Sequence, residues 1–310
     1  MSAPPRPSTS SPDHRSGFVS LVGRPNVGKS TLLNRLLGQK IAIVSPKPQT
    51  TRNRIRGIRT LPEAQIVYVD TPGLHPPRGK LGHFLARTAA EALAEVDGVV
   101  FVADATEPLE ALDDRTLATL HTVAAPVLLA LNKVDRVRDK SRLLPLLQGY
   151  AARYAFRELI PLSAANGVGV AQLEAAVLRL LRPGPAFYPG DTLTDQPETF
   201  FVAETIREQL FLSTRQEVPY ASAVRVEELV DRGPQGPVYI RALIFVEQSS
   251  QKAIVIGARG AMLKRIGQAA RRELEAFFGV PVYLDLWVQV RKRWRRDAQA
   301  LRELGYRLTS

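Results

Sequence analysis

Eight consecutive residues near the N-terminus match a phosphate-binding pattern, G-x-x-x-x-G-K-[S/T]. They are Gly23-Arg24-Pro25-Asn26-Val27-Gly28-Lys29-Ser30, directly after one apolar run and at the start of an amphipathic one. Its glycines let backbone N–H groups curl around phosphate oxygens where a helix begins. Lys29 would reach the β and γ phosphates, and Ser30 would ligate Mg²⁺. We expect this loop, with the following Thr31, to bind a nucleoside triphosphate.

A second short motif, Asp70-Thr71-Pro72-Gly73, ends the next apolar run. The Asp70 carboxylate can hold magnesium through water, and the Gly73 N–H can contact the γ-phosphate. The motif alone is weak, because about one chance match per chain is expected from composition. The motif becomes more specific because it follows a strand and lies downstream of the phosphate loop. Leu74 follows, at the position of the water-orienting Gln of Ras-like enzymes, so it would adjoin the nucleotide and unaided hydrolysis should be slow.

Between these motifs lies a polar segment, Pro46-Lys47-Pro48-Gln49-Thr50-Thr51-Arg52. A segment that offers Thr hydroxyls here indicates a switch that closes on Mg²⁺ and the γ-phosphate. We favour Thr51 as the metal-facing hydroxyl over Thr50, and an ordinary polar loop is the alternative. No residue is assigned as a catalyst in the strict sense; Lys29, Thr51 and Gly73 are expected to support the transition state.

A third motif, Asn132-Lys133-Val134-Asp135, ends another apolar strand and bears on which base is bound. The Asp135 carboxylate can accept hydrogen bonds from N1–H and the exocyclic amine of guanine. Adenine offers neither donor, and a buried carboxylate left without a partner is costly. The Lys133 stem would cover the ring, and an N–H of Ser163-Ala164 would meet the guanine oxygen. GTP and GDP are therefore the predicted ligands, with a metabolic P-loop enzyme or ATPase as the rival interpretation.

The elements around these motifs alternate between short apolar strands and longer helices. Strands are expected at 18–22, 65–70, 98–103, 126–131 and 158–162, and helices near 30–37, 82–95, 112–122, 141–154 and 171–181. This alternation predicts an α/β fold with a doubly wound, mainly parallel P-loop GTPase sheet. A Pro- and Gly-containing break follows. We therefore place a disordered leader at 1–16, the nucleotide domain at 17–182 and a linker at 183–198.

The second half of the chain has a different order of helices and strands. A helix near 199–213 leads to two β-rich runs, 221–230 and 238–246, then a Gly-bounded turn, one long helix and a strand at 280–290. This order predicts a smaller α+β domain over 199–310 that ends in a helix.

Charge is concentrated at the C-terminal end of the chain. The net charge is +12, and residues 248–310 hold 13 Lys and Arg against five Asp and Glu. This asymmetry indicates a polyanionic partner, although on charge alone a solvated basic face is equally consistent. The chain has no cysteine, which excludes disulfides, zinc–thiolate sites and Cys nucleophiles. No apolar run is long enough to span a membrane.

The Gly-bounded turn, Gly257-Ala258-Arg259-Gly260, carries the second functional signal. An apolar helical turn precedes it, and an amphipathic helix with the stripe Leu263, Ile266, Ala270, Leu274 and Phe277 follows it. Glycines let a nucleic-acid backbone approach, and this is the arrangement of a KH domain, here of type II, whose G-x-x-G loop clamps about four nucleotides of single-stranded RNA. The predicted RNA contacts are Gly257, Ala258, Arg259, Gly260, Lys264 and Arg265. A purely structural helix–turn–helix is the alternative.

A basic run, Arg291-Lys292-Arg293-Trp294-Arg295-Arg296, ends the last strand. Basic residues that flank an aromatic ring can grip phosphate and stack a base. A strand end in solvent, with Trp294 packed on the domain, explains the same residues equally well. Arg291 and Arg293 are therefore supporting candidates for RNA contact.

Taken in order, these motifs resemble the bacterial Era family of GTPases over about residues 17–308. The resemblance includes the T-T-R of the switch, N-K-V-D, S-A-A-N-G and the KH-like domain, and the closing runs 286–291 and 301–306. Two departures are visible. The variable pair of the G-x-x-G loop is Ala258-Arg259, with one basic residue, and the Pro/Ser-rich leader is extra.

The resemblance implies a ribosome-assembly factor that binds near the 3′ end of small-subunit ribosomal RNA and acts on the 30S subunit. It implies that the γ-phosphate orders Thr50, Thr51 and Gly73, and that this order governs the grip on RNA. It also implies K⁺ near the β and γ phosphates, held with help from Asn26, and a cytoplasmic location with peripheral membrane contact. We expect a monomer. A GTPase whose basic domain binds protein or anionic lipid instead of RNA is the remaining rival.

Overall fold

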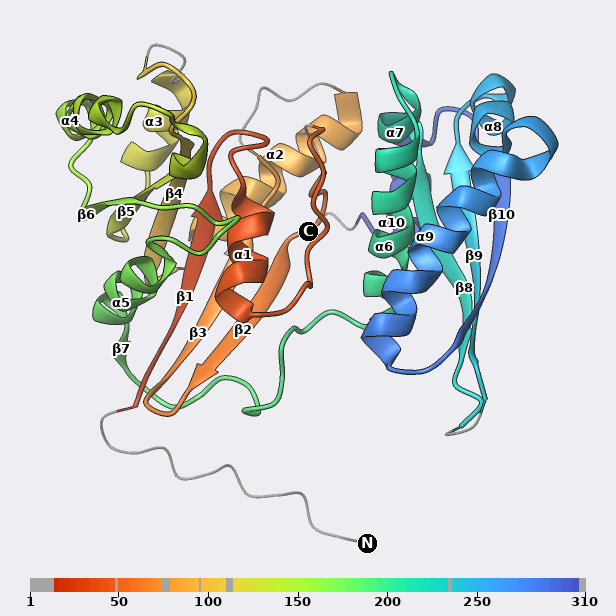
Figure 1. Ribbon diagram of the computed structural model, residues 1–310, viewed down its shortest axis with the longest axis horizontal. Coiled ribbons are helices and arrows are strands. Elements are labelled where there is room, and N and C mark those ends of the chain that lie inside the picture. The colour runs from red at the N-terminus through yellow and green to blue at the C-terminus, as the bar shows by residue number, and fades with distance from the viewer. Residues whose placement is uncertain are drawn as a thin grey trace, which may run out of the picture. The chain divides into compact units, whose positions relative to one another are not determined.

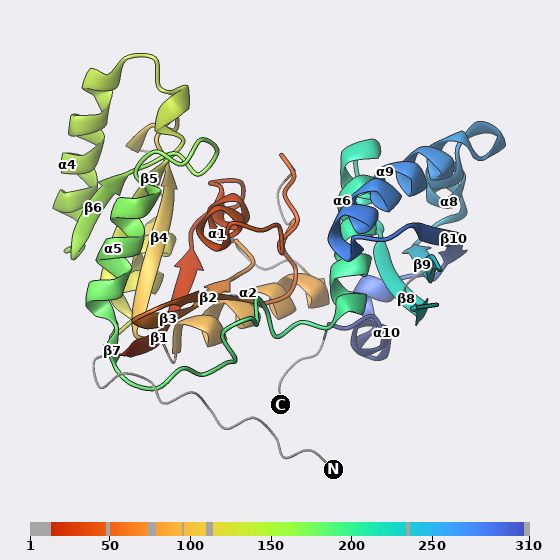
Figure 2. The same cartoon turned by 60° about the horizontal axis from the view of Figure 1, so that its bottom comes forward.

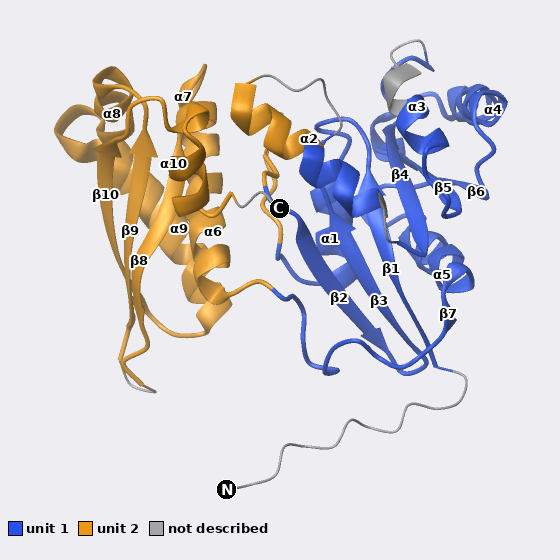
Figure 3. Cartoon of the chain, turned by 180° about the vertical axis from the view of Figure 1, so that it is seen from behind, with its two compact units in different colours: residues 1–41, 53–75, 87–195 blue, residues 42–52, 76–86, 196–310 orange. Residues whose placement is uncertain are grey.

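The structure is a computed structural model that describes residues 14–47, 50–73, 79–94, 96–109, 114–233 and 236–306. The chain divides into two compact units (Figure 3). The first comprises residues 1–41, 53–75 and 87–195, and the second comprises 42–52, 76–86 and 196–310. The predicted leader lies outside the described residues up to position 13. No helix in the described part of the chain is long and apolar enough to cross a membrane.

The first unit is built on one sheet whose main strands run in the order β2-β3-β1-β4-β5-β6 (Figure 1). Pairs within β3-β1-β4-β5-β6 are parallel, and β2 is antiparallel to β3. The strands are β1 (Arg15–Val22), β2 (Ile55–Leu61), β3 (Ala64–Asp70), β4 (Gly98–Asp104), β5 (Val127–Asn132) and β6 (Glu158–Pro161), and a short β7 (Arg182–Pro183) pairs with β1. The helices are α1 (Lys29–Leu37), α2 (Gly79–Ala94), α3 (Asp114–His121), α4 (Leu143–Arg153) and α5 (Val170–Leu180), and the first part of α2 belongs to the second unit.

This sheet confirms the predicted mainly parallel α/β fold. Every residue of β3, β4 and β5 is buried, as expected for parallel strands that are covered on both faces. The predicted strands and helices all exist, within a few residues of their expected ends. Strand β2 was not predicted; it is an edge strand whose arginines at positions 56 and 59 interrupt its apolar pattern.

The segment that was predicted as a linker, 183–198, packs on the first unit as far as Asp195. Buried Gln65 holds it: the side-chain amide donates to the Tyr188 carbonyl at 2.8 Å and accepts from the N–H of Phe187 at 2.7 Å. Arg56 forms an ion pair with Asp195 at 3.0 Å. The segment is therefore anchored by a polar residue within a strand, a contact that no local sequence pattern indicates.

The second unit has a three-stranded sheet in the order β10-β9-β8, with α6 and α9 side by side on one face (Figure 2). Strands β8 and β9 are antiparallel, and β9 and β10 are parallel. The elements are α6 (Glu198–Ser213), α7 (Val218–Ala221), β8 (Ala223–Val230), β9 (Val238–Val246), α8 (Ser249–Ile256), α9 (Ala261–Phe278), β10 (Val282–Val290) and α10 (Ala298–Glu303). This is the smaller α+β domain that the sequence predicts.

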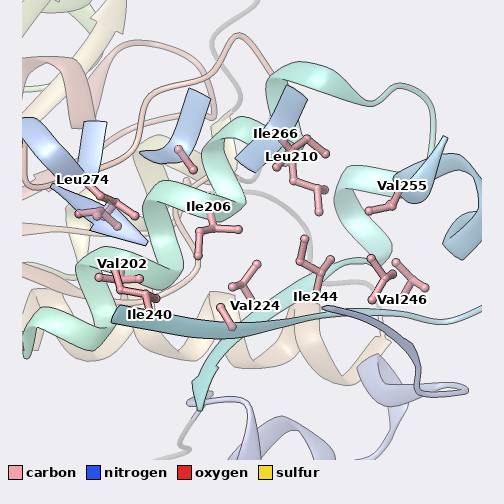
Figure 4. Close-up of a cluster of buried hydrophobic side chains, with 14 of the residues drawn as sticks. Val202, Ile206, Leu210, Val224, Ile240, Ile244, Val246, Val255, Ile266 and Leu274 are labelled. Atoms are coloured by element: carbon pink, nitrogen blue, oxygen red, sulfur yellow. The ribbon is translucent and has the colours of Figure 1, made fainter. Parts of the chain in front are cut away.

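The core of this domain lies between its sheet and its helices (Figure 4). Ile206 of α6, Ile266 and Leu274 of α9, and Ile240 and Ile244 of β9 are fully buried there. Of the predicted apolar stripe of α9, Ile266, Ala270 and Leu274 are buried in this core and Leu263 is partly buried against it. Phe277 stacks on Phe201, and its neighbour Phe278 packs against the core in its place. On β8 and β9, the alternate side chains Ala223, Leu243 and Phe245 join a second apolar cluster that includes Trp294 and residues of α10.

Candidate functional site

The phosphate loop of the first unit joins β1 to α1 in a conformation that demands glycine. Gly23 has φ +151° and Gly28 has φ +102°. A Cβ atom at Gly23 would lie 2.3 Å from the Val102 carbonyl oxygen, and one at Gly28 would lie 2.3 Å from the Asn132 amide nitrogen. No side chain caps the start of α1 at Lys29. The start of a helix without a side-chain cap is a position that suits an anion.

The Lys29 side chain folds back into its own loop. Its ammonium donates to the carbonyl oxygens of Gly23 at 3.1 Å and Arg24 at 2.9 Å. Burial lowers the pKa of Lys29 to about 8, partly opposed by the negative charge of Asp70. A bound phosphate would supply the counter-charge that this buried cation requires.

Ser30 and Asp70 meet beside Lys29. The Ser30 hydroxyl donates to Asp70 Oδ2 at 2.7 Å, and Asp70 is fully buried at the end of β3. Gly73 lies against the loop, since a Cβ atom there would be 2.7 Å from the Pro25 nitrogen. Hydroxyl and carboxylate oxygens are ligands that suit Mg²⁺, which usually takes its other ligands from phosphate and water. Leu74, the predicted neighbour of the nucleotide, lies outside the described residues.

Asn132 connects three loops at the same edge of the sheet. Its Nδ2 donates to the Val27 carbonyl at 2.8 Å, and its Oδ1 accepts from the Ala164 N–H at 2.9 Å. Arg35 of α1, which the sequence did not single out, donates to the Ala164 carbonyl at 3.1 Å. The amide of Asn132 is thus used to hold the phosphate loop and the Ser163-Ala164 loop together.

Lys133 and Asp135 occupy the predicted base site. Lys133 has φ +65°, and its ammonium donates to the Asn26 carbonyl at 2.7 Å and to Asp104 at 2.5 Å. Burial alone would raise the pKa of Asp104, but hydrogen bonds from Lys133 and Thr106 outweigh it and hold this pKa below its usual value. Asp135 is exposed, in a short 3₁₀ helix after β5, where its carboxylate is accessible to a ligand. Asp104, at the end of β4, was missed; only its place after an apolar strand signals it.

The predicted switch residues Thr50 and Thr51 belong to the second unit. Both are buried, and the Thr50 carbonyl accepts a hydrogen bond from Arg207 of α6. Neighbouring Arg52 is 2% exposed and donates to the carbonyls of Ser222 at 2.7 Å and Tyr220 at 3.1 Å. The structure therefore groups Thr51 with α6 and α7, while Ser30 and Asp70 belong to the first unit.

The G-x-x-G loop of the second unit has a left-handed backbone at three of its four residues, and two of these are its glycines. Gly257, Arg259 and Gly260 have φ of +73°, +51° and +79°, and the Arg259 side chain is exposed. A groove of about 380 Å³ starts at Gly260 and runs between α9 and the edge strand β10. Lys264 lines this groove, and Arg265 beside it is exposed.

In the basic run after β10, the position of Trp294 disagrees with the base-stacking interpretation. Trp294 is fully buried, donates its indole N–H to the Ala221 carbonyl at 2.8 Å and stacks on Tyr306. The packed alternative therefore describes this side chain. Arg291 forms an ion pair with Glu303 at 2.6 Å, whereas Arg293 is exposed with φ +57°.

Comparisons with known proteins agree with this pair of sites. The family described as 50S ribosome-binding GTPase matches residues 18–133, and the KH domain family matches residues 217–295. GTPase Era of Geobacter metallireducens is 51% identical over 94% of this chain and 98% of its own length. GTPase Era of Lacticaseibacillus paracasei is 49% identical over 95% of this chain and 97% of its own length.

Two solved Era structures share both units. A point variant of Aquifex aeolicus Era bound to GDP·AlF₄⁻ has a TM-score of 0.91, and Era in complex with MgGDPNP and nucleotides 1506–1542 of 16S ribosomal RNA has a TM-score of 0.92. Each is 39% identical to this chain and covers 95% of it and 100% of its own length. Since relatives at about half identity match nearly the whole chain, in both its nucleotide site and its KH domain, the protein belongs to the Era family of GTPases.

Proposed function

We propose that this GTPase binds GTP on Mg²⁺ and uses it to control its hold on small-subunit ribosomal RNA, near the 3′ end, during assembly of the 30S subunit. The hydrogen-bonded Ser30–Asp70 pair beside the buried Lys29 ammonium is the observation that carries the nucleotide half. Together these groups offer oxygen ligands for a metal and a positive charge for phosphate. Magnesium, when bound there, would neutralise charge on the β and γ phosphates.

Each residue of the site then has a definite task. Lys29 would bind the β and γ phosphates, Ser30 would ligate the metal, and Asp70 would hold it through water. The Gly73 N–H and the Thr51 hydroxyl would contact the γ-phosphate and the metal when GTP is bound. Such contacts place charge stabilisation where it grows during phosphoryl transfer. Asp135 would select guanine, with the Lys133 stem over the ring.

The KH domain carries the RNA half of the proposal. The solved relative with MgGDPNP also holds nucleotides 1506–1542 of 16S ribosomal RNA, which supports the same class of ligand here. The Gly257-Ala258-Arg259-Gly260 loop would clamp the strand, with Lys264 and Arg265 on its phosphates. Arg293 is exposed and suited to a further phosphate contact, whereas Arg291 would first have to exchange Glu303 for phosphate.

The remaining expectations rest on the resemblance to the family. They are a monomeric protein in the cytoplasm, peripheral contact with the inner membrane, and a K⁺ ion near Asn26. In the structure the Asn26 carbonyl accepts a hydrogen bond from Lys133. This is the main-chain oxygen, so a potassium ion held by the side-chain carbonyl of Asn26 would leave the hydrogen bond to Lys133 in place.

The experiment is a pair of titrations on one preparation of the full chain. GDP, GTP and ATP are titrated by calorimetry with and without Mg²⁺, and an RNA spanning nucleotides 1506–1542 of 16S ribosomal RNA is titrated in each nucleotide state. We expect guanine specificity, magnesium-dependent binding of GTP and RNA affinity that differs between GDP and a non-hydrolysable GTP analogue. Equal RNA affinity in both states would refute the switch.

A further inference from the structure

A second basic concavity lies at the opposite end of α8 from the G-x-x-G loop. It has a volume of about 510 Å³ and is formed where β9 ends, α8 begins and the chain leaves β10. Its lining includes Glu247 and Ser249 from the start of α8, and Lys292, Arg293 and Arg296 from the segment after β10. The groove beside Gly260 has different lining residues, so the two concavities are separate.

The charges of this basic pocket are predominantly unneutralised. Its one lining carboxylate, Glu247, is bound by Arg295, whose Nε lies 3.0 Å from Glu247 Oε2. Lys292, Arg293 and Arg296 are exposed, and none of them forms an ion pair with a described residue. Three cations around one concavity repel one another, so an anion bound between them would lower the electrostatic free energy.

Contacts of the neighbouring residues hold the segment that carries these cations in place. Trp294 lies between Arg293 and Arg295 and is fully buried, with its indole N–H bonded to the Ala221 carbonyl and its ring stacked on Tyr306. The Glu247–Arg295 pair fixes the next residue. Arg293 holds a left-handed backbone, with φ +57°, between these contacts. Backbone strain of this kind persists where surrounding contacts enforce it, and it directs the flanking side chains.

The distance between the two basic features matches a continuous strand of nucleic acid. Helix α8 has eight residues and is therefore about 12 Å long at 1.5 Å per residue. The G-x-x-G loop follows its last residue, and the basic pocket begins at its first. Stacked nucleotides advance about 3.4 Å each, so about four nucleotides span this length.

We propose that Lys292, Arg293 and Arg296 form a second RNA site, which grips the phosphodiester backbone of the strand as it leaves the G-x-x-G clamp. This inference rests on the proposed RNA-binding function and extends it. The pocket is lined almost wholly by polar and charged groups, with Val290 as its one aliphatic side chain. Stable contact with a membrane surface requires buried apolar groups besides a basic patch, so the lining favours RNA.

The test compares two triple variants of the full chain with equal changes in net charge. One is Lys292→Gln/Arg293→Gln/Arg296→Gln, and the other is Arg15→Gln/Arg157→Gln/Arg182→Gln, whose side chains are exposed in the first unit. Binding of the RNA spanning nucleotides 1506–1542 is measured over a salt series. Affinity for GDP and the thermal melting curve serve as controls for folding.

The pocket variant should bind this RNA at least tenfold more weakly at low salt. The slope of log K against log salt should shrink by about two to three units, since three phosphate contacts are lost. The control triple should behave like the parent. If the pocket variant is poorly folded, the single variant Lys292→Gln should still reduce the slope by about one unit.

Three outcomes distinguish failure of the second RNA site, failure of the proposed function and assignment of the pocket to a membrane surface. An unchanged slope in both the triple and the Lys292→Gln variant, with the parent binding RNA, overturns the second site and leaves the proposed function intact. No RNA binding by the parent refutes the proposed function itself. Loss of binding to vesicles of phosphatidylglycerol in the pocket variant, with RNA binding unchanged, would assign the pocket to a membrane surface instead.

Discussion

Arg207 of α6 donates a hydrogen bond to the main-chain carbonyl of Thr50 at 2.5 Å. The same guanidinium is paired with Glu204, and all three residues are buried. Burial would lower the pKa of Arg207, but the Glu204 charge outweighs it and raises this pKa. The chain enters the second unit at Ala42 and returns to the first at Asn53. A charged side chain of the RNA-binding domain thus holds the segment that carries the predicted metal-facing hydroxyl.

Arg207→Met should therefore uncouple RNA affinity from the bound nucleotide. It leaves Glu204 buried without its cation, which costs about 3 kcal/mol of folding free energy. The double variant Glu204→Leu/Arg207→Met should regain much of that stability but not the coupling, because Thr50 still lacks its donor. Urea denaturation measures the first effect, and RNA titrations with GDP and a GTP analogue measure the second. A fully coupled double variant would show that this hydrogen bond does not transmit the nucleotide state.

The ligand preference for guanine should depend on Asp135. The parent should bind GDP several orders of magnitude more tightly than ADP, because adenine lacks both donors that the carboxylate accepts. Asp135→Asn should lose at least 100-fold in GDP affinity and gain affinity for xanthosine diphosphate, whose C2 oxygen can accept from the new amide. A competition titration with the three diphosphates measures this. Similar affinities of the parent for GDP and ADP would contradict the assignment.

Nucleotide affinity should fall as the pH rises through the pKa of Lys29, which is about 8 without a ligand. Phosphate binding favours the ammonium form, so above this pH the protein must take up a proton to bind GDP. The affinity should be flat below about pH 7 and decline between pH 8 and 9. Calorimetry in buffers with different ionisation enthalpies measures the proton uptake, and Lys29→Met should bind weakly without it.

Lys29 affects the free energy of unfolding in the opposite direction from the nucleotide affinity. Between about pH 8 and its usual pKa of 10.5, Lys29 is neutral in the ligand-free folded protein and protonated when unfolded. The unfolded state then binds more protons, so this residue makes the free energy of unfolding rise with pH in that window. Below about pH 8 both states are protonated, and the residue contributes no slope.

The loops of the candidate nucleotide site were predictable because their residues lie in short contiguous motifs after strands. The bends at Gly23 and Gly28 follow from local backbone needs, and α1 begins within one residue of its expected start. Asp104 and Arg35 were not predictable in this way, because their partners Lys133 and Ala164 are 29 and 129 residues away. A single sequence does not report such distant pairs.

In the KH domain, too, local patterns were predictable and long-range contacts were not. The glycines of the G-x-x-G loop and the apolar stripe of α9 are local patterns, and they have the expected place except at the end of the stripe, where Phe278 packs on the core instead of Phe277. The burial of Trp294 depends on Ala221 and Tyr306, which come from other parts of the chain. The burial of Arg52 likewise depends on the carbonyls of α7. Long-range packing of this kind decides whether a basic or aromatic residue faces solvent, and composition does not reveal it.

Hydrolysis by the isolated protein should be slow and should respond to potassium. Leu74 cannot orient water, and K⁺ beside the β and γ phosphates would supply charge stabilisation that an arginine finger gives elsewhere. Turnover is compared in sodium and potassium buffers for the parent and for Asn26→Ala. We expect faster turnover in potassium and a weaker potassium response in the variant. Equal turnover of the parent in the two buffers would rule out a potassium site.

RNA binding through the G-x-x-G loop is tested by the variant Gly260→Asp. A Cβ atom at Gly260 would meet no atom within 4 Å, and Asp is among the residues that tolerate the left-handed backbone. The fold should therefore survive, while the new carboxylate repels phosphate at the clamp. Arg259→Ala, as a milder variant, should only weaken binding and reduce the salt slope by about one unit.

The measurement is a filter-binding titration of the RNA spanning nucleotides 1506–1542, over a salt series, with GTP affinity determined on the same preparation. We expect Gly260→Asp to lose RNA binding and to keep the parent's affinity for GTP, because the clamp and the nucleotide loop belong to different units. If Gly260→Asp binds this RNA as tightly as the parent does, the G-x-x-G loop is not the clamp.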